Sequence, residues 1–236
     1  SIPVRFFTPA LEVPICGHAT VATHTVRALE SGVTSGTVTQ ASPGGRWDIS
    51  WERVGDVCRV TMRQQPVVRR GEVGNRADIA AALGVGVDAL VSDWPIEVWS
   101  TGSDKILVPV AASEVLAGLE PDQGSLRELS TPWGGAGFFV FTLGATEPGF
   151  LTECRMFGPS VGVPEDPVNG SGHGPLAGYL WARGTLPDSA SFRSRMGTAM
   201  GRPGAVDVAA IVGDHGPVAV DVTGAAVVVF RAEFEA

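Results

Sequence analysis

The sequence predicts an α+β fold of many short strands and a few helices. Its 31 glycines and 17 prolines divide the 236 residues into short runs, many of them rich in Val and Thr, which favour strands. A unit of strand, Pro/Gly-bounded loop and helix start also occurs twice. The first copy contains Arg5, Phe7, Pro9, Val13, Pro14 and Gly17-His18, which return 150 to 155 positions later as Arg155, Phe157, Pro159, Val163, Pro164 and Gly172-His173. The repeat indicates either two related halves, each with one helix after its glycine loop, or a duplicated turn unit alone.

Composition narrows the class of protein. Hydrophobic residues make up 44% of the chain and charged residues 18%, so a sizeable core is expected. The net charge of −8 argues against a nucleic-acid or anionic-membrane partner, and no apolar run approaches the roughly 18 residues of a membrane helix. Three widely spaced cysteines are typical of a reducing compartment, and the N-terminus lacks the basic start and apolar core of a signal peptide. We therefore expect a cytoplasmic protein with no membrane partner.

The first half, residues 1–70, is expected to hold one helix and several strands. The helix covers residues 18–30, because Ala, Val and Leu gather on one side and Gly32 follows its end. Two alternating runs predict a hairpin. The expected strands are residues 1–9, 33–40, 47–51 and 57–62, with a turn at residues 42–45.

The second half, residues 71–236, is expected to alternate strands with short helices. A helix over residues 78–83 ends at Gly84, and Ser113 is the expected N-cap of another over residues 113–119. A third helix follows the second glycine loop at residues 176–183. The expected strands are residues 98–100, 106–110, 137–143, 191–196, 205–212 and 218–230, the last of which could return to the first half.

The two glycine loops are the expected binding site. Gly at a loop–helix junction lets the backbone approach a ligand, and a helix N-terminus offers free N–H groups with a partial positive charge. Two such ends facing each other would hold a small carboxylate. The residues expected to line this site are Cys16, Gly17, Ala19, Gly170 and Gly172.

Asp166 is the first candidate for catalysis. It precedes the second glycine loop in Glu165-Asp166-Pro167, where an acid can both take and return a proton beside a bound carboxylate. The alternative is that it only caps a turn. His18 is the second candidate, because a histidine at a helix N-terminus is expected to have a lowered pKa and to relay protons in its neutral form.

Cys16 and Ser171 precede the Gly-His pair of their own copies. A thiol at a helix N-terminus can become reactive, so two opposed groups of this kind would make a two-base racemase. Only one of them is a cysteine, and a serine without a partner base is a poor base. We therefore expect Ser171 to donate a hydrogen bond to the substrate, and Cys16 to be a small packed residue or, in an epimerase, a base.

Metal and cofactor patterns are not found. The histidines are scattered, no cysteine pair has zinc spacing, and Gly170-Ser171-Gly172-His173-Gly174 has the wrong spacing for a dinucleotide or phosphate loop. The expectation is that the protein uses no metal and no cofactor.

Four ordered motifs together resemble the phenazine-biosynthesis PhzF-like family. They are Arg5-Phe6-Phe7-Thr8-Pro9 with Glu12-Val13-Pro14-Ile15-Cys16-Gly17-His18-Ala19-Thr20, then Ser100-Thr101-Gly102 with Leu107-Val108-Pro109, then residues 165–176, then Met200-Gly201-Arg202-Pro203-Gly204. The resemblance implies the diaminopimelate-epimerase-like fold, with two pseudo-symmetric domains that each curl a mostly antiparallel sheet around one helix. It also implies a cofactor-independent isomerase, usually a homodimer, that shifts a proton and a double bond in a small unsaturated cyclic acid. By position, His18, Asp166 and Ser171 match family residues around the substrate.

One departure from the family bears on the mechanism. The family's main acid/base is a glutamate upstream of the first motif, whereas only three residues precede Val4 here and none is Glu. Either the sequence is a fragment, or it is a shortened member in which Asp166 carries the proton with His18 as relay. Glu12 is a weaker substitute. A shortened first domain would expose a sheet edge, so we expect a homodimer that covers it.

Three functions remain open from the sequence. The first is an isomerase that acts by 1,3- or 1,5-proton transfer in secondary metabolism, on a phenazine-like or modified proline or pyrroline precursor. The second is an amino-acid epimerase that uses Cys16. The third is a non-catalytic protein that binds a small acid.

Overall fold

One large sheet organises the molecule. The structure is a computed structural model that describes residues 1–8 and 11–233. Within this part, thirteen strands share one sheet in the order β1-β4-β5-β6-β15-β14-β13-β11-β10-β9-β8-β7, with β12 paired to β11, and β2 and β3 pair separately. The strands are β1 (Ile2–Pro3), β2 (Phe6–Phe7), β3 (Glu12–Val13), β4 (Ser35–Ser42), β5 (Gly45–Val54), β6 (Val57–Arg63), β7 (Val68–Glu72), β8 (Glu97–Ser100), β9 (Asp104–Pro109), β10 (Gly137–Leu143), β11 (Thr152–Gly158), β12 (Val163–Asp166), β13 (Ser191–Met196), β14 (Gly204–Gly213) and β15 (Gly216–Ala225).

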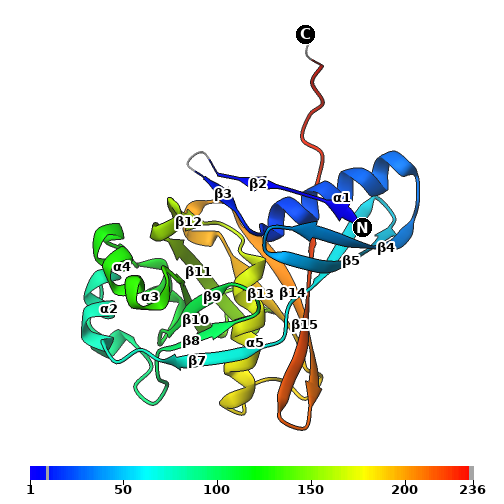
Figure 1. Ribbon diagram of the computed structural model, residues 1–236. Coiled ribbons are helices and arrows are strands. Elements are labelled where there is room, and N and C mark those ends of the chain that lie inside the picture. The colour runs from blue at the N-terminus through cyan, green and yellow to red at the C-terminus, as the bar shows by residue number, and fades with distance from the viewer. Residues whose placement is uncertain (9–10, 234–236) are drawn as a thin grey trace.

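In the first half, helix α1 (Gly17–Ser31) lies across the antiparallel strands β4, β5 and β6 (Figure 1). The helix ends at Ser31 and is capped by Gly32, whose left-handed φ of 69° suits glycine. Alternate residues of β5 and β6, among them Trp47, Ile49, Val60 and Met62, form a small core on the side of the sheet that α1 covers. The expected helix and hairpin of this half are confirmed.

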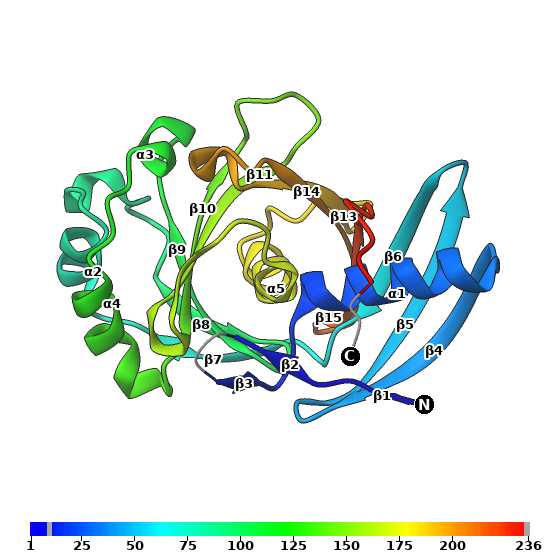
Figure 2. The same ribbon diagram turned by 90° about the horizontal axis from the view of Figure 1, so that it is seen from above.

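In the second half, helix α5 (His173–Ala182) runs through the middle of a curled sheet (Figure 2). Residues 173 to 180 are all buried, as expected for a helix that is apolar on every side. Close packing requires glycine at position 178, where a Cβ atom would lie 2.4 Å from Val67. Outside the sheet, short helices cover its opposite face: α2 (Arg76–Ala82), α3 (Ser113–Ala117) and α4 (Gln123–Ser130).

Strand β15 joins the sheets of the two halves. It pairs antiparallel with β14 along one edge and with β6 along the other, from Asp221–Arg63 to Ala225–Arg59. The last strand of the chain therefore lies beside a strand of the first half. The division into domains at residue 70 stays a prediction.

Several elements differ from expectation. The strand expected over residues 1–9 is wrong: β1 pairs with β4 while β2 turns away to pair with β3, and residue 9 lies outside the described part. The last strand ends at Ala225 rather than residue 230. Ser113 is the first residue of α3 and Ala112 is its N-cap. The helix after the second loop begins at His173, because Pro175 in its first turn needs no hydrogen-bond donor.

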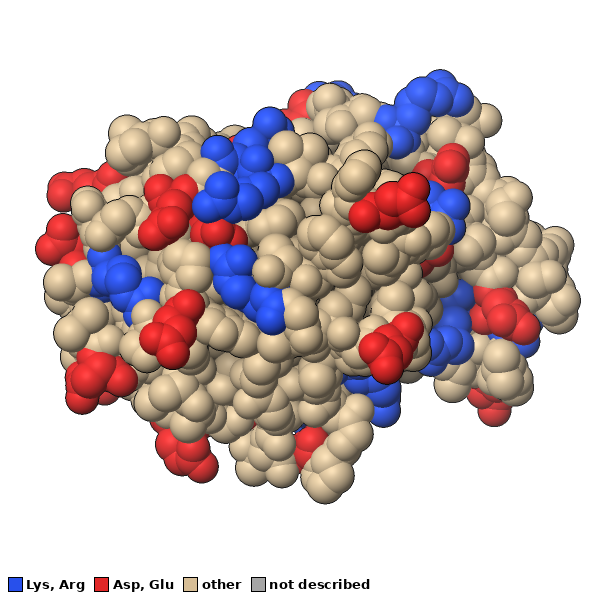
Figure 3. Space-filling model, turned by 90° about the horizontal axis from the view of Figure 1, so that it is seen from below, with Lys and Arg blue, Asp and Glu red and all other residues tan. Residues whose placement is uncertain are grey.

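The surface carries charges of both signs. On the face shown in Figure 3, acidic and basic side chains are interspersed over both halves. Within residues 1–8 and 11–233, no helix has the length and apolar character needed to cross a membrane.

Candidate active site

The two glycine loops meet between the halves. A Cβ atom on Gly17, at the start of α1, would lie 3.8 Å from Cα of Gly170. Gly170 begins a short 3-10 helix (Gly170–Gly172) that leads into α5. Gln64, which follows β6, donates from Nε2 to the Gly170 carbonyl over 2.9 Å and accepts at Oε1 from Thr101 over 2.6 Å. Gln64 thus ties the second glycine loop to the chain that follows β6 and to Thr101.

The repeat in the sequence is also a repeat in space. Arg5 reaches Glu12 through two hydrogen bonds of 2.9 and 2.8 Å, and Arg155 reaches Glu165 through two of the same lengths. Each guanidinium also lies over the phenyl ring two residues on, at 4.9 Å for Phe7 and 5.1 Å for Phe157. Each copy is therefore a short antiparallel strand pair with the same fork-shaped ion pair beside the same ring.

A cavity of about 640 Å³ opens where the two copies face each other. It is lined by seven of the eight residues that the sequence analysis singled out, namely Cys16, Gly17, His18, Ala19, Asp166, Gly170 and Ser171. The eighth, Gly172, is buried behind the lining, where a Cβ atom would lie 2.2 Å from the Phe139 ring. Gly172 therefore lets α5 pack closely and does not line the cavity.

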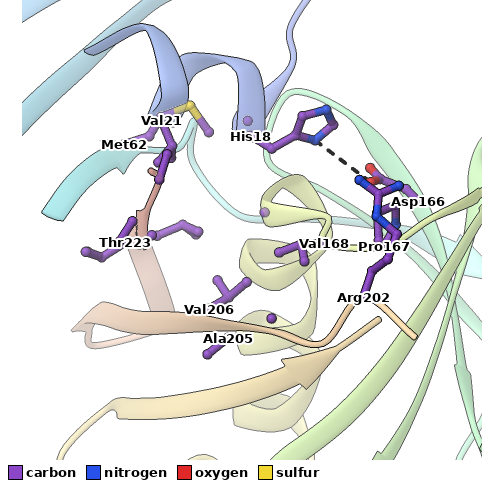
Figure 4. A pocket seen from close by; sticks show the side chains of 17 residues that line it. His18, Val21, Met62, Asp166, Pro167, Val168, Arg202, Ala205, Val206 and Thr223 are labelled. Atoms are coloured by element: carbon purple, nitrogen blue, oxygen red, sulfur yellow. Dashed lines mark ion pairs between the residues drawn. The ribbon is translucent and has the colours of Figure 1, made fainter. Parts of the chain in front are cut away.

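The imidazole of His18 lies between a thiol and a carboxylate. Its Nε2 is 3.3 Å from Cys16 Sγ, and its Nδ1 is 3.8 Å from Asp166 Oδ1 (Figure 4). The His18 side chain is 59% exposed, whereas that of Asp166 is 13% exposed. The hydrogen bond to Cys16 is the largest cause that raises the pKa of His18 to about 9, with smaller contributions from the charges of Cys16 and Asp166. The expected lowering of this pKa is wrong, because these two neighbours outweigh desolvation.

Asn169 organises the second loop, and the sequence analysis missed it. Its Nδ2 donates to Asp166 Oδ2 over 2.9 Å, while its Oδ1 accepts from Ser171 Oγ and the Gly172 amide over 3.0 and 2.9 Å. The signal was an Asn directly before Gly-Ser-Gly, a preferred N-cap residue. Asn169 therefore fixes the direction of the Asp166 carboxylate and accepts a hydrogen bond from the Ser171 hydroxyl.

A second cavity, of about 430 Å³, lies on the other side of the His18–Asp166 pair. Its walls are mostly apolar, with Met62, Val206 and Val222 among them. Arg202 and Asp166 both line this cavity (Figure 4). The same pair of titratable residues thus borders both cavities.

Lys105 is a second residue that the sequence analysis missed. It lies in β9, lines the larger cavity and is 3% exposed. Lys105 lies far in sequence from both glycine-loop motifs, so its position at the cavity could not be predicted from the spacing of residues. Within the described ranges, no group of three or more His, Cys, Asp and Glu side chains is placed to hold a metal ion.

The model of the phenazine biosynthesis-like protein family matches residues 1–232. The uncharacterized isomerase YddE of Escherichia coli K12 is 36% identical over 99% of this chain and 80% of its own length, and an uncharacterized isomerase of Clostridium acetobutylicum is 34% identical over 98% and 78%. The chain belongs to the phenazine biosynthesis-like family, and it is an isomerase.

Solved structures agree on the fold. A phenazine biosynthesis protein of the PhzF family from Bacillus anthracis superposes with a TM-score of 0.83 at 23% identity, covering 94% of this chain and 76% of that one. A probable proline racemase from Agrobacterium radiobacter superposes with a TM-score of 0.61 at 18% identity, covering 94% and 68%. The predicted α+β, diaminopimelate-epimerase-like fold is confirmed.

Proposed function

We propose that this isomerase moves a proton and a double bond in a small unsaturated cyclic carboxylic acid, without a cofactor. The observation that carries the proposal is the pair of Asp166 and His18, held 3.8 Å apart on facing copies of the repeat and bordering a cavity of small-molecule size. Family membership supports the reaction class. The setting we propose is secondary metabolism, with a phenazine-like or modified proline or pyrroline precursor as substrate.

In this mechanism Asp166 carries the proton. Its carboxylate takes a proton from a carbon next to the conjugated system, and the electron pair of that C–H bond spreads over the system and the substrate carboxylate. The carboxyl proton exchanges with solvent, and Asp166 then delivers a proton to the far carbon, so the double bond moves and the Asp166 carboxylate is restored. Asn169 holds the carboxylate in position, while His18, protonated at neutral pH because its pKa is raised to about 9, stabilises the negative charge that develops.

The test is proton NMR in D₂O with a panel of unsaturated cyclic amino and carboxylic acids. We expect deuterium at a carbon whose double bond has moved, and loss of that turnover in Asp166→Asn without loss of folding. Asp214→Asn, an exposed acid in the β14–β15 turn, is the matched control. Full turnover in Asp166→Asn would contradict the proposed role of this carboxylate.

A second candidate function, amino-acid epimerisation, is favoured by the thiol of Cys16. This half-buried thiol lies 3.3 Å from His18 Nε2 and lines the larger cavity, as a base would. Deuterium at an inverted α-carbon with no moved double bond, abolished by Cys16→Ala, would identify an epimerase. A moved double bond that persists in Cys16→Ala, even at a rate lowered by the smaller charge on His18, would identify the double-bond isomerase. Ligand binding with no exchange in any assay would point to a binding protein.

We further propose that the chain acts as a homodimer. Residues 227–230, which follow β15, expose large apolar side chains, with Val227 and Val229 each 84% exposed. A second copy would cover them. Light scattering after size exclusion tests this, and a monomer at micromolar concentration would contradict it.

A further inference from the structure

Lys105 stands apart from every other cation of the chain. It is the only lysine in the 236-residue sequence, and all other Lys+Arg positions are arginine. Lysine side chains are rarely buried, yet Lys105 is 3% exposed. It occupies the second position of β9, on the same face as Leu107, which packs in the core around α5. The strand therefore directs this side chain toward the interior of the curled sheet, where it lines the larger cavity.

The ammonium group lacks an anionic partner. Its Nζ donates to Ser103 Oγ over 2.6 Å and to the Asp104 carbonyl over 3.3 Å. Among the described residues, no carboxylate oxygen lies within 4.0 Å of it. Burial lowers the pKa of Lys105 to about 8, although the charges of Asp104 and Asp166 act in the opposite direction. A buried cation without a close counter-ion is unfavourable, and an anion entering the cavity would relieve that cost.

The other charges around the cavity are already engaged. Glu165 is held by Arg155, and Arg5 is held by Glu12, each through two hydrogen bonds. His18 contacts Cys16 and faces Asp166. Lys105 is thus the cation on the cavity wall that has no side-chain charge bound to it.

We propose that Lys105 Nζ binds the carboxylate of the substrate, as a charged anchor in addition to the backbone amides of the glycine loops. This inference rests on the proposed function, because it assigns the substrate's acid group to one end of the same cavity. An anion at Lys105 would leave the remainder of the ring in the cavity that Asp166 also lines. The ligand class is a small planar carboxylate.

The first test compares the binding of a carboxylate with that of an uncharged analogue. Pyrrole-2-carboxylate and pyrrole-2-carboxamide have nearly the same shape and differ in charge. By calorimetry, we expect Lys105→Met to weaken carboxylate binding roughly 10- to 100-fold, the size of a lost charge-assisted hydrogen bond, and to leave carboxamide binding unchanged. Lys105→Arg keeps the charge and should retain most of the carboxylate affinity.

The second test needs no variant. In protein grown with lysine labelled at Cε and Nζ, the labelled side chain is that of Lys105 alone, so its NMR titration can be followed directly. We expect a midpoint near pH 8 that rises on addition of pyrrole-2-carboxylate and stays in place with the carboxamide. The titratable and charged groups that line the same cavity are Arg5, Cys16, His18, Glu165 and Asp166, and Asp104 precedes Lys105 in β9. Only the bound anion differs between the two additions.

Clear results would overturn the proposal. Unchanged carboxylate affinity in Lys105→Met, an unmoved Lys105 titration at saturating carboxylate, or no carboxylate binding by the wild-type chain would each do so. A Lys105→Met enzyme that binds the carboxylate normally but has lost only kcat would make Lys105 an acid/base group instead. These outcomes are separate from the test of the proposed function. Turnover in D₂O can fail while Lys105 still binds the carboxylate, and turnover can succeed although Lys105 does not bind it.

Discussion

Gly17-His18 and Gly172-His173 are the same dipeptide at the same place in two copies of one unit, yet their histidines are opposite in character. His18 is exposed beside a thiol and a carboxylate, and its pKa is raised to about 9. His173 is fully buried, its Nδ1 lies 2.8 Å from the Asn169 carbonyl, and the Phe139 ring meets it edge-on at 5.2 Å. Burial lowers its pKa to about 4. One copy thus presents its histidine to the cavity, and the other places it in the core.

The ion pairs of the two copies differ in the same direction. Arg5 is 67% exposed and Arg155 only 10% exposed, although both hold their glutamate with the same geometry. Arg155 also donates to the carbonyls of Leu116 and Leu119. A duplicated motif thus keeps its geometry, while the surroundings of each copy decide whether that geometry contributes to catalysis or to stability.

The largest expected difference between the copies is in catalysis. His18→Gln should lower kcat by roughly 10²-fold or more, because the charge beside Asp166 is lost, with little change in melting temperature. His173→Gln should lower the melting temperature and leave kcat per folded molecule nearly unchanged. Steady-state kinetics and thermal melts of both variants check this, and a kcat loss confined to His173→Gln would reverse the assignment.

The next largest difference is expected in how much Arg5 and Arg155 contribute to stability. Arg155→Met leaves Glu165 and two carbonyls without their donor in a buried place, so we expect the free energy of unfolding to fall by about 3 kcal/mol. Arg5→Met removes the same pair from an exposed position and should change stability little. Urea titration measures both, and equal losses would show that burial does not distinguish the copies.

Lowering the pH should destabilise the fold through protonation of the buried His173. Since the folded-state pKa of His173 is below its unfolded value, the unfolded chain binds more protons between pH 6.5 and pH 4. The stability from keeping it neutral is present above pH 6.5 and lost as pH falls toward 4, about 2 kcal/mol of it by pH 5. Denaturation at pH 7 and pH 5 tests this, with His173→Phe as the variant that should lose the difference.

The smallest expected effect is a change in the pKa of His18, measured by NMR titration. Cys16→Ala removes the main cause of the raised His18 pKa, so the NMR midpoint of His18 should fall from about 9 toward its usual value. Stability at neutral pH should stay nearly constant. A midpoint unmoved by Cys16→Ala would mean that Asp166, not the thiol, sets the charge of His18.

The sequence allowed the repeat, the helix after each glycine loop and the cavity-lining residues to be predicted, because each depends on neighbours in the chain. It did not reveal the matched ion pairs, since Glu12 and Glu165 lie at different distances from their arginines. Lys105 was missed because strand pairing in three dimensions, not spacing, brings β9 to the cavity. The pKa of His18 was predicted with the wrong sign, because the helix end was considered without the thiol beside it. Strand β7 was missed because its sequence, Val-Arg-Arg-Gly-Glu, is polar, as suits the edge of a sheet.

Strand β15 has a thermodynamic consequence. Its hydrogen bonds to β6 on one side and β14 on the other make a single ladder pass from the core under α1 to the core around α5. If either core unfolds, β15 loses its hydrogen bonds on one side, and the sheet of the other core is disrupted. The two cores should therefore melt together in one calorimetric peak whose van't Hoff and measured enthalpies agree.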